Sequence, residues 1–297
     1  MSDATDTWAI EARNRVYEDR EFPYTQRDFQ KIAAMVHADA GISLSNVKAP
    51  LVYSRLVRRL RSLGVESFKR YCALVEGDEG SAERGQMIAA LTTNVTRFFR
   101  EPHHFEHLKT KVLPGLVEGV RRGRPLRIWS AGCSSGEEPY SIALSILSVM
   151  PDAMHHDVKV LATDVNRNVV EKGREGIYND AAIAPVSRQM RAQWFTRQRN
   201  ADGSKTWQVG DALRGLVAFR ELNLLDEWPM RQAYQAIFCR NVTIYFEDEL
   251  QTQICNRLIE KLAPGGRLYV GHSERILDDR VLIDGNTVYR LRGEREE

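Results

Sequence analysis

Residues 128–140 have the sequence IWSAGCSSGEEPY, in which an apolar run leads into a loop of small residues and then into two acids and a proline. This order predicts a β-strand, a tight turn and the start of a helix. Gly132 and Gly136 have no Cβ, so we expect the backbone to pass close to a ligand at this turn.

The kind of ligand follows from what the turn lacks. Its spacing is not GxGxxG, and no P-loop lysine follows. Glu137 and Glu138 would repel a pyrophosphate at the positive end of the helix, so a ligand with positive charge is favoured. The alternative is a tight turn whose acids only compensate the helix dipole.

A second polar position follows the next apolar run. Residues 161–166 have the sequence LATDVN, which places Asp164 at the carboxyl end of a predicted strand. An acid there can accept hydrogen bonds from both ribose hydroxyls of a nucleoside. Alternatively, Asp164 is the N-cap of the next helix. Together the two segments predict a nucleoside across the strand ends.

The pattern after residues 124–125 indicates βαβ units, hence a parallel sheet covered by helices. Short apolar runs alternate there with longer amphipathic segments, and the expected strands are 126–130, 158–163, 236–239, 268–271 and 287–291. The Pro264-Gly265-Gly266 turn is expected to lead into the fourth of these strands. Residues 206–209 and 216–219 are expected to form a small antiparallel excursion.

Residues 24–91 have helical periodicity throughout, which predicts a small all-α bundle. Thr25 and Asp28 resemble a capping box, and Gly41 ends this first helix. A second helix is expected from Pro50 to Gly64, with an apolar stripe made of Val52, Leu56, Leu60 and Leu63. Two further helices are expected around 68–75 and 87–91.

The composition is that of a globular protein, with 43% hydrophobic and 28% charged residues. A net charge of +2 is too small for a general nucleic-acid binder. No apolar stretch approaches the ~18 residues that a membrane span needs. Residues 1–22 lack the apolar region of a signal peptide and are expected to be a flexible tail. Four cysteines without a CxxC pair fit reduced thiols in a cytoplasmic protein.

Two more segments combine polar residues with aromatic ones. Residues 91–101 have the sequence LTTNVTRFFRE, and residues 238–246, FCRNVTIYF, leave a predicted strand. Six blocks closely resemble the chemotaxis receptor methyltransferases, the CheR family: 91–105, 130–141, Thr163-Asp164, Asn223-Leu224, 239–246 and Gly271-His272-Ser273-Glu274. The order and spacing of the blocks also match, from about residue 24 onward.

The resemblance implies an α/β fold: a class I S-adenosylmethionine-dependent methyltransferase domain, Rossmann-like with a mostly parallel sheet, over residues 125–297. A small antiparallel β-subdomain is expected at about 196–219. An all-α receptor-recognition domain would span 23–91, and residues 92–124 would form a linker and connecting helix. The implied reaction methylates glutamate side chains of chemotaxis receptors and leaves S-adenosylhomocysteine, with no metal.

The resemblance also implies the residues that hold the cofactor. Asp164 would bind the ribose, Asn223-Leu224 would flank the adenine, and Arg240-Asn241 would lie near the methionine end. Glu137 remains an alternative to its neighbour Glu138. The full cofactor set is Asn94, Thr96, Arg100, Glu138, Asp164, Asn223, Leu224, Arg240 and Asn241.

Two residues are expected to act in catalysis, although no general base is required. A glutamate side chain, with a pKa near ~4.3, is already an anionic nucleophile at neutral pH. Arg100 is expected to clamp the incoming carboxylate, and Tyr245 to shape the wall near the transferred methyl group. The alternatives are an ion pair for Arg100 and a core position for Tyr245.

The helix expected after Pro50 is strongly basic. Such a run of basic residues usually forms a solvent-exposed helix face. Nucleic-acid binding is not supported, because no aromatic residues are interleaved with the basic ones. The resemblance implies a more specific partner, the glutamate-rich cytoplasmic helices of methyl-accepting chemotaxis receptors, with no insertion into the membrane. The receptor-facing residues would be Arg55, Arg58, Arg59 and Arg61. Residues 199–205 show no recognisable peptide-tethering motif, so tethering of a receptor peptide by the β-subdomain stays open.

Other functions fit less well. Residues 103–107, HHFEH, match the H-x-x-E-H motif of zinc proteases, but they lie within the methyltransferase block. A nicotinamide-dependent oxidoreductase lacks support because GxGxxG is missing. Arg240-Asn241-Val242 replaces the Pro-Pro-aromatic motif of methyltransferases that modify amino groups. A non-catalytic receptor adaptor would show decayed cofactor positions, and none of the expected positions is decayed.

Overall fold

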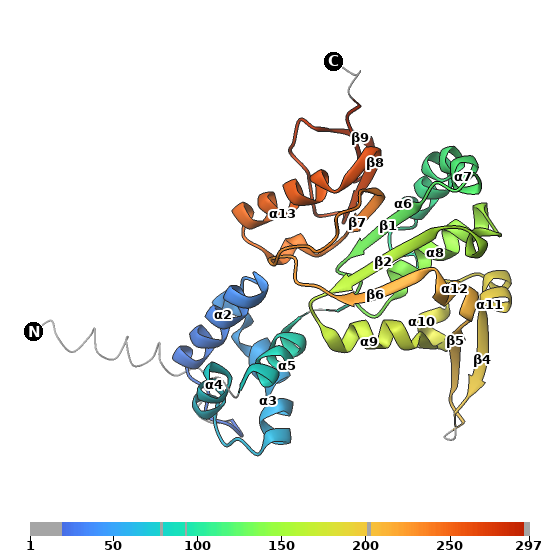
Figure 1. Ribbon diagram of the computed structural model, residues 1–297. Coiled ribbons are helices and arrows are strands. Elements are labelled where there is room, and N and C mark those ends of the chain that lie inside the picture. Colours follow the sequence, from blue (N-terminus) through green and yellow to red (C-terminus); the bar gives the residue numbers. More distant parts are fainter. Residues whose placement is uncertain (1–19, 78–79, 93, 201–202, 294–297) are drawn as a thin grey trace, which may run out of the picture. The chain divides into compact units, whose positions relative to one another are not determined.

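The computed structural model describes residues 20–77, 80–92, 94–200 and 203–293 (Figure 1). The chain divides into two compact units, Met1–Thr93 and Asn94–Glu297. Most of the tail expected at residues 1–22 lies outside the described part. Among the described helices, none has the length and apolar character that crossing a membrane requires.

The first unit is helical, as the sequence predicted. The capping box is confirmed, because the Thr25 Oγ1 accepts from the Asp28 N–H at 3.2 Å and Asp28 Oδ2 accepts from the Thr25 N–H at 2.9 Å. Gly41, with φ of 69°, ends the first helix in the left-handed conformation. The helices are α2 (Gln26–Ala40), η1 (Asn46–Lys48), α3 (Ala49–Leu63), α4 (Phe68–Glu76) and α5 (Ser81–Leu91).

The buried face of α3 differs from the expected stripe at one position. Leu63 is 41% exposed, so its assignment to the stripe was wrong. It occupies the last turn before Gly64, where the chain turns away in the left-handed conformation. The buried residues of α3 are Ala49, Val52, Tyr53, Leu56, Val57 and Leu60.

Three of the four α3 arginines have partners inside this unit. Arg55 Nη1 donates to the carbonyl oxygens of Leu91 and Thr92, at 2.7 and 3.0 Å, at the end of α5. Arg59 forms a two-pronged ion pair with Glu83, whose Oε1 also accepts from the Tyr71 hydroxyl at 2.8 Å.

The other two arginines of α3 are more exposed. Arg61 pairs with Glu21 near the surface, and both side chains are about half exposed. Arg58 is exposed, and its side chain has no hydrogen-bond or ion-pair partner among the described residues. The guanidinium of Arg58 is therefore available to a binding partner, whereas that of Arg59 is occupied by its ion pair with Glu83.

The second unit is built on a seven-stranded sheet with the order β6-β2-β1-β7-β8-β10-β9. Figure 1 shows β6, β2, β1, β7 and β8 side by side, and these five strands pair in parallel. The strands β9 and β10 add an antiparallel hairpin at the edge beyond β8. The strands are β1 (Leu126–Ala131), β2 (Val158–Asp164), β6 (Val217–Glu221), β7 (Tyr234–Cys239), β8 (Leu262–Val270), β9 (Val281–Gly285) and β10 (Val288–Leu291).

Helices cover both faces of this sheet because side chains alternate along each strand. Ile128 of β1 joins the core that includes α8 (Glu137–Val149), whereas its neighbour Trp129 joins the core that includes α13 (Asp248–Glu260). The remaining helices of the unit are α6 (Pro102–His107), α7 (Pro114–Arg121), α9 (Arg167–Glu175), α10 (Asp180–Ile183), α11 (Arg188–Trp194), α12 (Asp211–Gly215), the 3₁₀ turns η4 (Ala153–His155) and η5 (Thr243–Tyr245) and the π-helix η3 (Leu108–Val112).

Two expectations about strands were wrong. Residues 216–219 do not pair with 206–209; residues 217–219 belong to β6, the edge strand of the main sheet beside β2. The Pro264-Gly265-Gly266 turn lies within β8, where the pairing with β7 shifts from Tyr234–Leu262 to Ala236–Arg267. The separate small sheet consists of β3 (Ile177–Asn179), β5 (Lys205–Val209) and β4 (Phe195–Arg199), in that order and antiparallel.

Residues 94–124, expected as a linker and connecting helix, belong to the second unit and contain α6, η3 and α7. Apolar side chains of this segment belong to the core on the α8 face of the sheet, which explains why the segment packs as part of the domain. Those buried in this core are Phe98, Phe105, Leu108, Val112, Leu113 and Val120.

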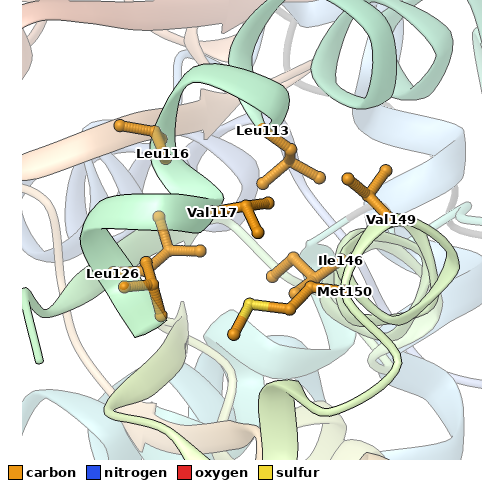
Figure 2. Close-up of a pocket in the computed structure, with 8 residues that line it drawn as sticks. Leu113, Leu116, Val117, Leu126, Ile146, Val149 and Met150 are labelled. Atoms are coloured by element: carbon orange, nitrogen blue, oxygen red, sulfur yellow. The ribbon is translucent and has the colours of Figure 1, made fainter. Parts of the chain in front are cut away.

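Figure 2 shows a small apolar cavity of about 10 Å³ beside α7. Leu126, the first residue of β1, is among the side chains around it, so the cavity lies away from the carboxyl ends of the strands. Its lining is entirely apolar: Leu113, Leu116, Val117, Val120, Leu126, Ile146, Val149 and Met150. It is too small and too apolar for a nucleoside.

We predict that Arg59→Ala destabilises the first unit and that Arg58→Ala does not. Without Arg59 the largely buried Glu83 loses its charge partner, which should cost about 2–3 kcal/mol, discounted because Arg59 is 29% exposed. The exposed Arg58 serves as the control and should change the stability by less than about 0.5 kcal/mol. Urea unfolding of the full chain measures both, and equal midpoints for the two variants would contradict this role of Arg59.

Candidate functional site

The carboxyl ends of four parallel strands meet at one edge of the main sheet. From β1 the chain proceeds to β2 and β6 on one side, and it later places β7 and β8 on the other side. The strand order therefore reverses at β1, and open α/β sheets bind ligands at such a reversal. The residues at these ends are Gly132 after β1, Asp164 of β2, Leu222-Asn223 after β6 and Arg240 after β7.

The glycines of the β1–α8 loop make room for neighbouring protein atoms. A Cβ on Gly132 would lie 2.3 Å from Val242 Cγ2. A Cβ on Gly136 would lie 2.8 Å from the Tyr178 hydroxyl and 2.9 Å from the Gly173 Cα. Both glycines have positive φ, 83° and 97°. They allow the loop to pack tightly against its neighbours.

Asp164 organises this loop from the end of β2. Its Oδ2 accepts from the Ser134 N–H at 2.8 Å, and its Oδ1 accepts from the Asn166 N–H at 2.9 Å. Burial raises the pKa of Asp164. Asn166 is the N-cap of α9, so the alternative role of Asp164 as that cap is wrong. Each carboxylate oxygen retains a lone pair for a further donor.

Glu138 and Arg240 form a buried ion pair that links α8 to the end of β7. Arg240 Nη1 donates to Glu138 Oε2 at 3.0 Å, and Ser130 Oγ donates to Glu138 Oε1 at 2.7 Å. Arg240 Nη2 donates to the Arg100 carbonyl and lies 3.2 Å from Glu101 Oε2. The side chain of Arg240 is only 1% exposed.

The pKa shifts in this cluster have opposite directions. Burial raises the pKa of Glu138, although Arg240 opposes the shift. Burial also disfavours the charged form of Glu101, but Arg240 and His272 outweigh it and lower the pKa of Glu101 to about 2. Burial lowers the pKa of His104 to about 3, so its imidazole is neutral at pH 7. The cluster thus contains one guanidinium, that of Arg240, paired with two carboxyl groups, those of Glu101 and Glu138.

The two candidate glutamates at the start of α8 point to different neighbours. Glu138 contacts Arg240, another expected site residue. Glu137 accepts from Ser135 Oγ at 2.7 Å, and burial raises its pKa. The geometry therefore groups Glu138, and not Glu137, with the other expected residues.

The segment that leads into α6 joins the same strand ends. Ser134 Oγ donates to the Asn94 carbonyl at 3.1 Å, and Ser134 N–H donates to Asp164, so Asn94 lies beside the expected ribose site. Arg100 Nη1 donates to the Val95 carbonyl at 2.9 Å. Thr96 is half-buried on this segment, and Tyr245 is half-buried in η5.

Asn223 and Leu224 follow β6, adjacent to Asp164. The Leu222 N–H donates to the Asp164 carbonyl at 3.0 Å. Arg257 of α13 donates to the Leu224 carbonyl at 2.7 Å, and its guanidinium lies 4.0 Å from the ring centre of Trp228. Trp228 donates to the same carbonyl at 3.3 Å. This segment is therefore held in place from the α13 face of the sheet.

The residues of the H-x-x-E-H match have separate partners. His107 Nδ1 contacts the Tyr269 hydroxyl at 3.0 Å, and Glu106 pairs with Lys109 at 2.6 Å. The ligand atoms of Glu101, His103 and His104 do lie within 4.8 Å of one another. The Glu101 carboxylate already pairs with Arg240 and His272, so it is engaged by protein side chains. This geometry disfavours the zinc-protease alternative.

Sequence reasoning assigned no role to Glu101, Glu274 or Arg257. Glu101 and Glu274 stood in the quoted segments 91–101 and 271–274, but the contacts that link them to the end of β7 join residues more than 30 positions apart in the chain. Arg257 stood in a plain amphipathic helix. A local motif carries no signal for such distant contacts.

Two family models match the chain in agreement with its two units. The model described as "CheR methyltransferase, all-alpha domain" matches residues 27–92. The model described as "CheR methyltransferase, SAM binding domain" matches residues 94–285. The boundary between the matches coincides with the division of the chain near residue 93.

Curated relatives match over most of their length. A probable chemotaxis protein methyltransferase of Rhizobium etli is 46% identical over 86% of this chain and 96% of the relative. Chemotaxis protein methyltransferase 2 of Pseudomonas aeruginosa is 40% identical, over 92% and 96%. The chemotaxis protein methyltransferase of Escherichia coli is 40% identical, over 89% and 90%. The chain is a member of the CheR methyltransferase family.

Proposed function

We propose that this enzyme transfers a methyl group from S-adenosylmethionine to glutamate side chains of chemotaxis receptors in the cytoplasm. The products are glutamate methyl esters and S-adenosylhomocysteine. The observation that carries the proposal is the meeting of Asp164 and the Glu138–Arg240 pair at the point where the strand order reverses. Family membership supports the methyl donor and the role in chemotaxis.

The residues present fit this cofactor. Asp164 retains acceptor capacity for two ribose hydroxyls. Arg240 Nε and Asn241 Oδ1 are buried without a hydrogen-bond partner among the described residues, which suits a polar ligand that would pair with them. Glu138 and Glu101 outnumber Arg240 in charge, in keeping with a sulfonium ligand. Asn94, Thr96, Arg100, Asn223, Leu224 and Asn241 complete the proposed cofactor site.

The chemistry requires positioning more than proton transfer. Bound S-adenosylmethionine supplies a methyl group activated by its sulfonium. The substrate carboxylate is already ionised, so the enzyme has to align it and exclude water, which is worth roughly 7–11 kcal/mol in favourable systems. Arg100 clamps the carboxylate, and Tyr245 forms the wall beside the reacting atoms. Among the described residues the Arg100 side chain makes one hydrogen bond, so other N–H groups remain free for a substrate.

The basic face of α3 is proposed to bind the receptor. Glutamate-rich receptor helices and a cationic helix are complementary in charge, which steers association. Arg58 is the first candidate because it has no partner among the described residues. Arg55, Arg59 and Arg61 contribute positive potential while holding intramolecular contacts.

The activity itself is tested with labelled S-adenosylmethionine and a receptor cytoplasmic fragment. We expect label in the receptor that is released as methanol in alkali, because methyl esters hydrolyse there and methylated amines and amides do not. Replacement of the receptor glutamates by alanine is the control. Alkali-stable label, or none, would refute the proposal.

Arg100→Ala and Tyr245→Phe test the catalytic roles. We expect each to lower kcat at least tenfold, since each removes a group that contacts the reacting atoms. The affinity for S-adenosylhomocysteine, measured by calorimetry, separates loss of binding from loss of chemistry. If both variants methylate within twofold of the wild-type rate, these assignments fail.

Arg58→Glu tests receptor recognition without disturbing the Arg59–Glu83 pair. Charge repulsion should raise the KM for the receptor fragment several-fold and leave the cofactor affinity unchanged. Lys69→Glu makes the same charge change on another helix of the same unit. An equal rise in KM for both variants would mean that net charge, and not the α3 face, sets the affinity.

A further inference from the structure

We propose that Glu274, the acid of the Gly271-His272-Ser273-Glu274 motif, is a positioning residue that holds Arg240 and Asn241 in their cofactor-binding conformation. This inference rests on the proposed function. It concerns a residue that does not itself contact the reacting atoms. Its action is transmitted through the loop that follows β7.

The Glu274 carboxylate gathers five hydrogen bonds while only 5% of the residue is exposed. Its Oε1 accepts from the N–H of Val242 at 3.1 Å, the N–H of Thr243 at 2.9 Å and the Thr243 hydroxyl at 2.7 Å. Its Oε2 accepts from the N–H of Asn241 at 2.8 Å and the N–H of Gly271 at 2.6 Å. Three consecutive N–H groups thus converge on one side chain.

The loop needs such an anchor because its backbone is not regular. Asn241 has φ of 59°, a left-handed conformation that costs free energy in a residue other than glycine. The loop bends there, and the N–H groups of residues 241–243 all turn inward. Without an acceptor these buried or partly buried N–H groups would be left unpaired within the protein, at a cost of up to about one lost hydrogen bond each.

Gly271 allows the close approach. A Cβ on Gly271 would lie 2.4 Å from Asn241 Nδ2 and 2.8 Å from Glu274 Oε2. The β8 end therefore contacts the Asn241 side chain directly. Any side chain at position 271 would displace either the Asn241 amide or the Glu274 carboxylate.

The two residues held by this anchor carry polar atoms that the protein leaves open. Arg240 Nε and Asn241 Oδ1 are buried without a hydrogen-bond partner among the described residues. Their orientation is fixed on one side by the ion pair of Arg240 with Glu138 and on the other by Glu274. Glu274 thereby pre-organises two unsatisfied polar atoms for a ligand, which reduces the cost of binding.

The first test is Glu274→Gln, which keeps the size and removes the charge. A neutral amide oxygen cannot accept all five bonds, and the amide NH₂ would face N–H donors. We expect the Kd for S-adenosylhomocysteine, measured by calorimetry, to rise about tenfold, with little change in the KM for the receptor fragment. Asp157→Asn is the control, because the Asp157 carboxylate pairs with Arg127 at the opposite end of the sheet. The Kd of this variant for S-adenosylhomocysteine should match that of the wild type.

Two measurements distinguish positioning by Glu274 from a merely structural role: the number of S-adenosylhomocysteine sites per chain, and a double-mutant cycle with Asn241→Ala. Partial unfolding would lower the number of binding sites without altering the Kd of the folded fraction. If Glu274 acts through Asn241, the effect of Glu274→Gln should largely vanish in an Asn241→Ala background. Full additivity of the two changes would overturn the proposal.

Gly271→Ala keeps the proposal testable if Glu274→Gln does not fold. It preserves the charge but pushes the Asn241 amide from its place, so the Kd should again rise by about tenfold. An unchanged Kd in folded Gly271→Ala would overturn the inference. Failure of the proposed function is distinct, since wild type itself would then bind no S-adenosylhomocysteine.

Discussion

The buried guanidinium of Arg240 is the interaction on which the candidate site depends. It contacts Glu138 at the start of α8, Glu101 before α6 and the carbonyl of Arg100, although its own side chain is almost fully buried. A charge in such a position costs several kcal/mol of desolvation unless it is paired with good geometry. The segment 100–101 and the start of α8 must therefore both reach the end of β7. Phe99 and Glu101, on either side of Arg100, adopt positive φ of 53° and 57° to do so.

Much of the fold could be predicted because its signals are local. The capping box at Thr25, the left-handed Gly41 and Gly64 and the short apolar strands each depend on a few neighbouring residues. The errors came from tertiary contacts. Residues 216–219 have the same composition whether they pair in a small hairpin or along β2, and only the packing of the whole sheet distinguishes these arrangements. The segment 94–124 resembled a linker because its core partners lie far along the chain.

The candidate site could be predicted only in part, for a related reason. Asp164 and Glu138 follow predicted strands, so the expected topology already assigned them to one edge of the sheet. The partners that orient them could not be inferred from that topology. The sequence around Glu101 does not indicate that it pairs with Arg240. The sequence around Arg257 does not indicate that it donates to the Leu224 carbonyl. The glycines of the β1–α8 loop show the same limit, since their missing Cβ atoms accommodate Val242, Tyr178 and Gly173.

The contact between Gly132 and Val242 has a consequence for how such sequences can diverge. A methyl group added at position 132 would overlap the Val242 side chain, so the two positions form one steric unit although they are 110 residues apart. A side chain at position 132 therefore fits only if Val242 or the loop backbone moves, and the left-handed φ of 83° adds strain for any residue other than glycine.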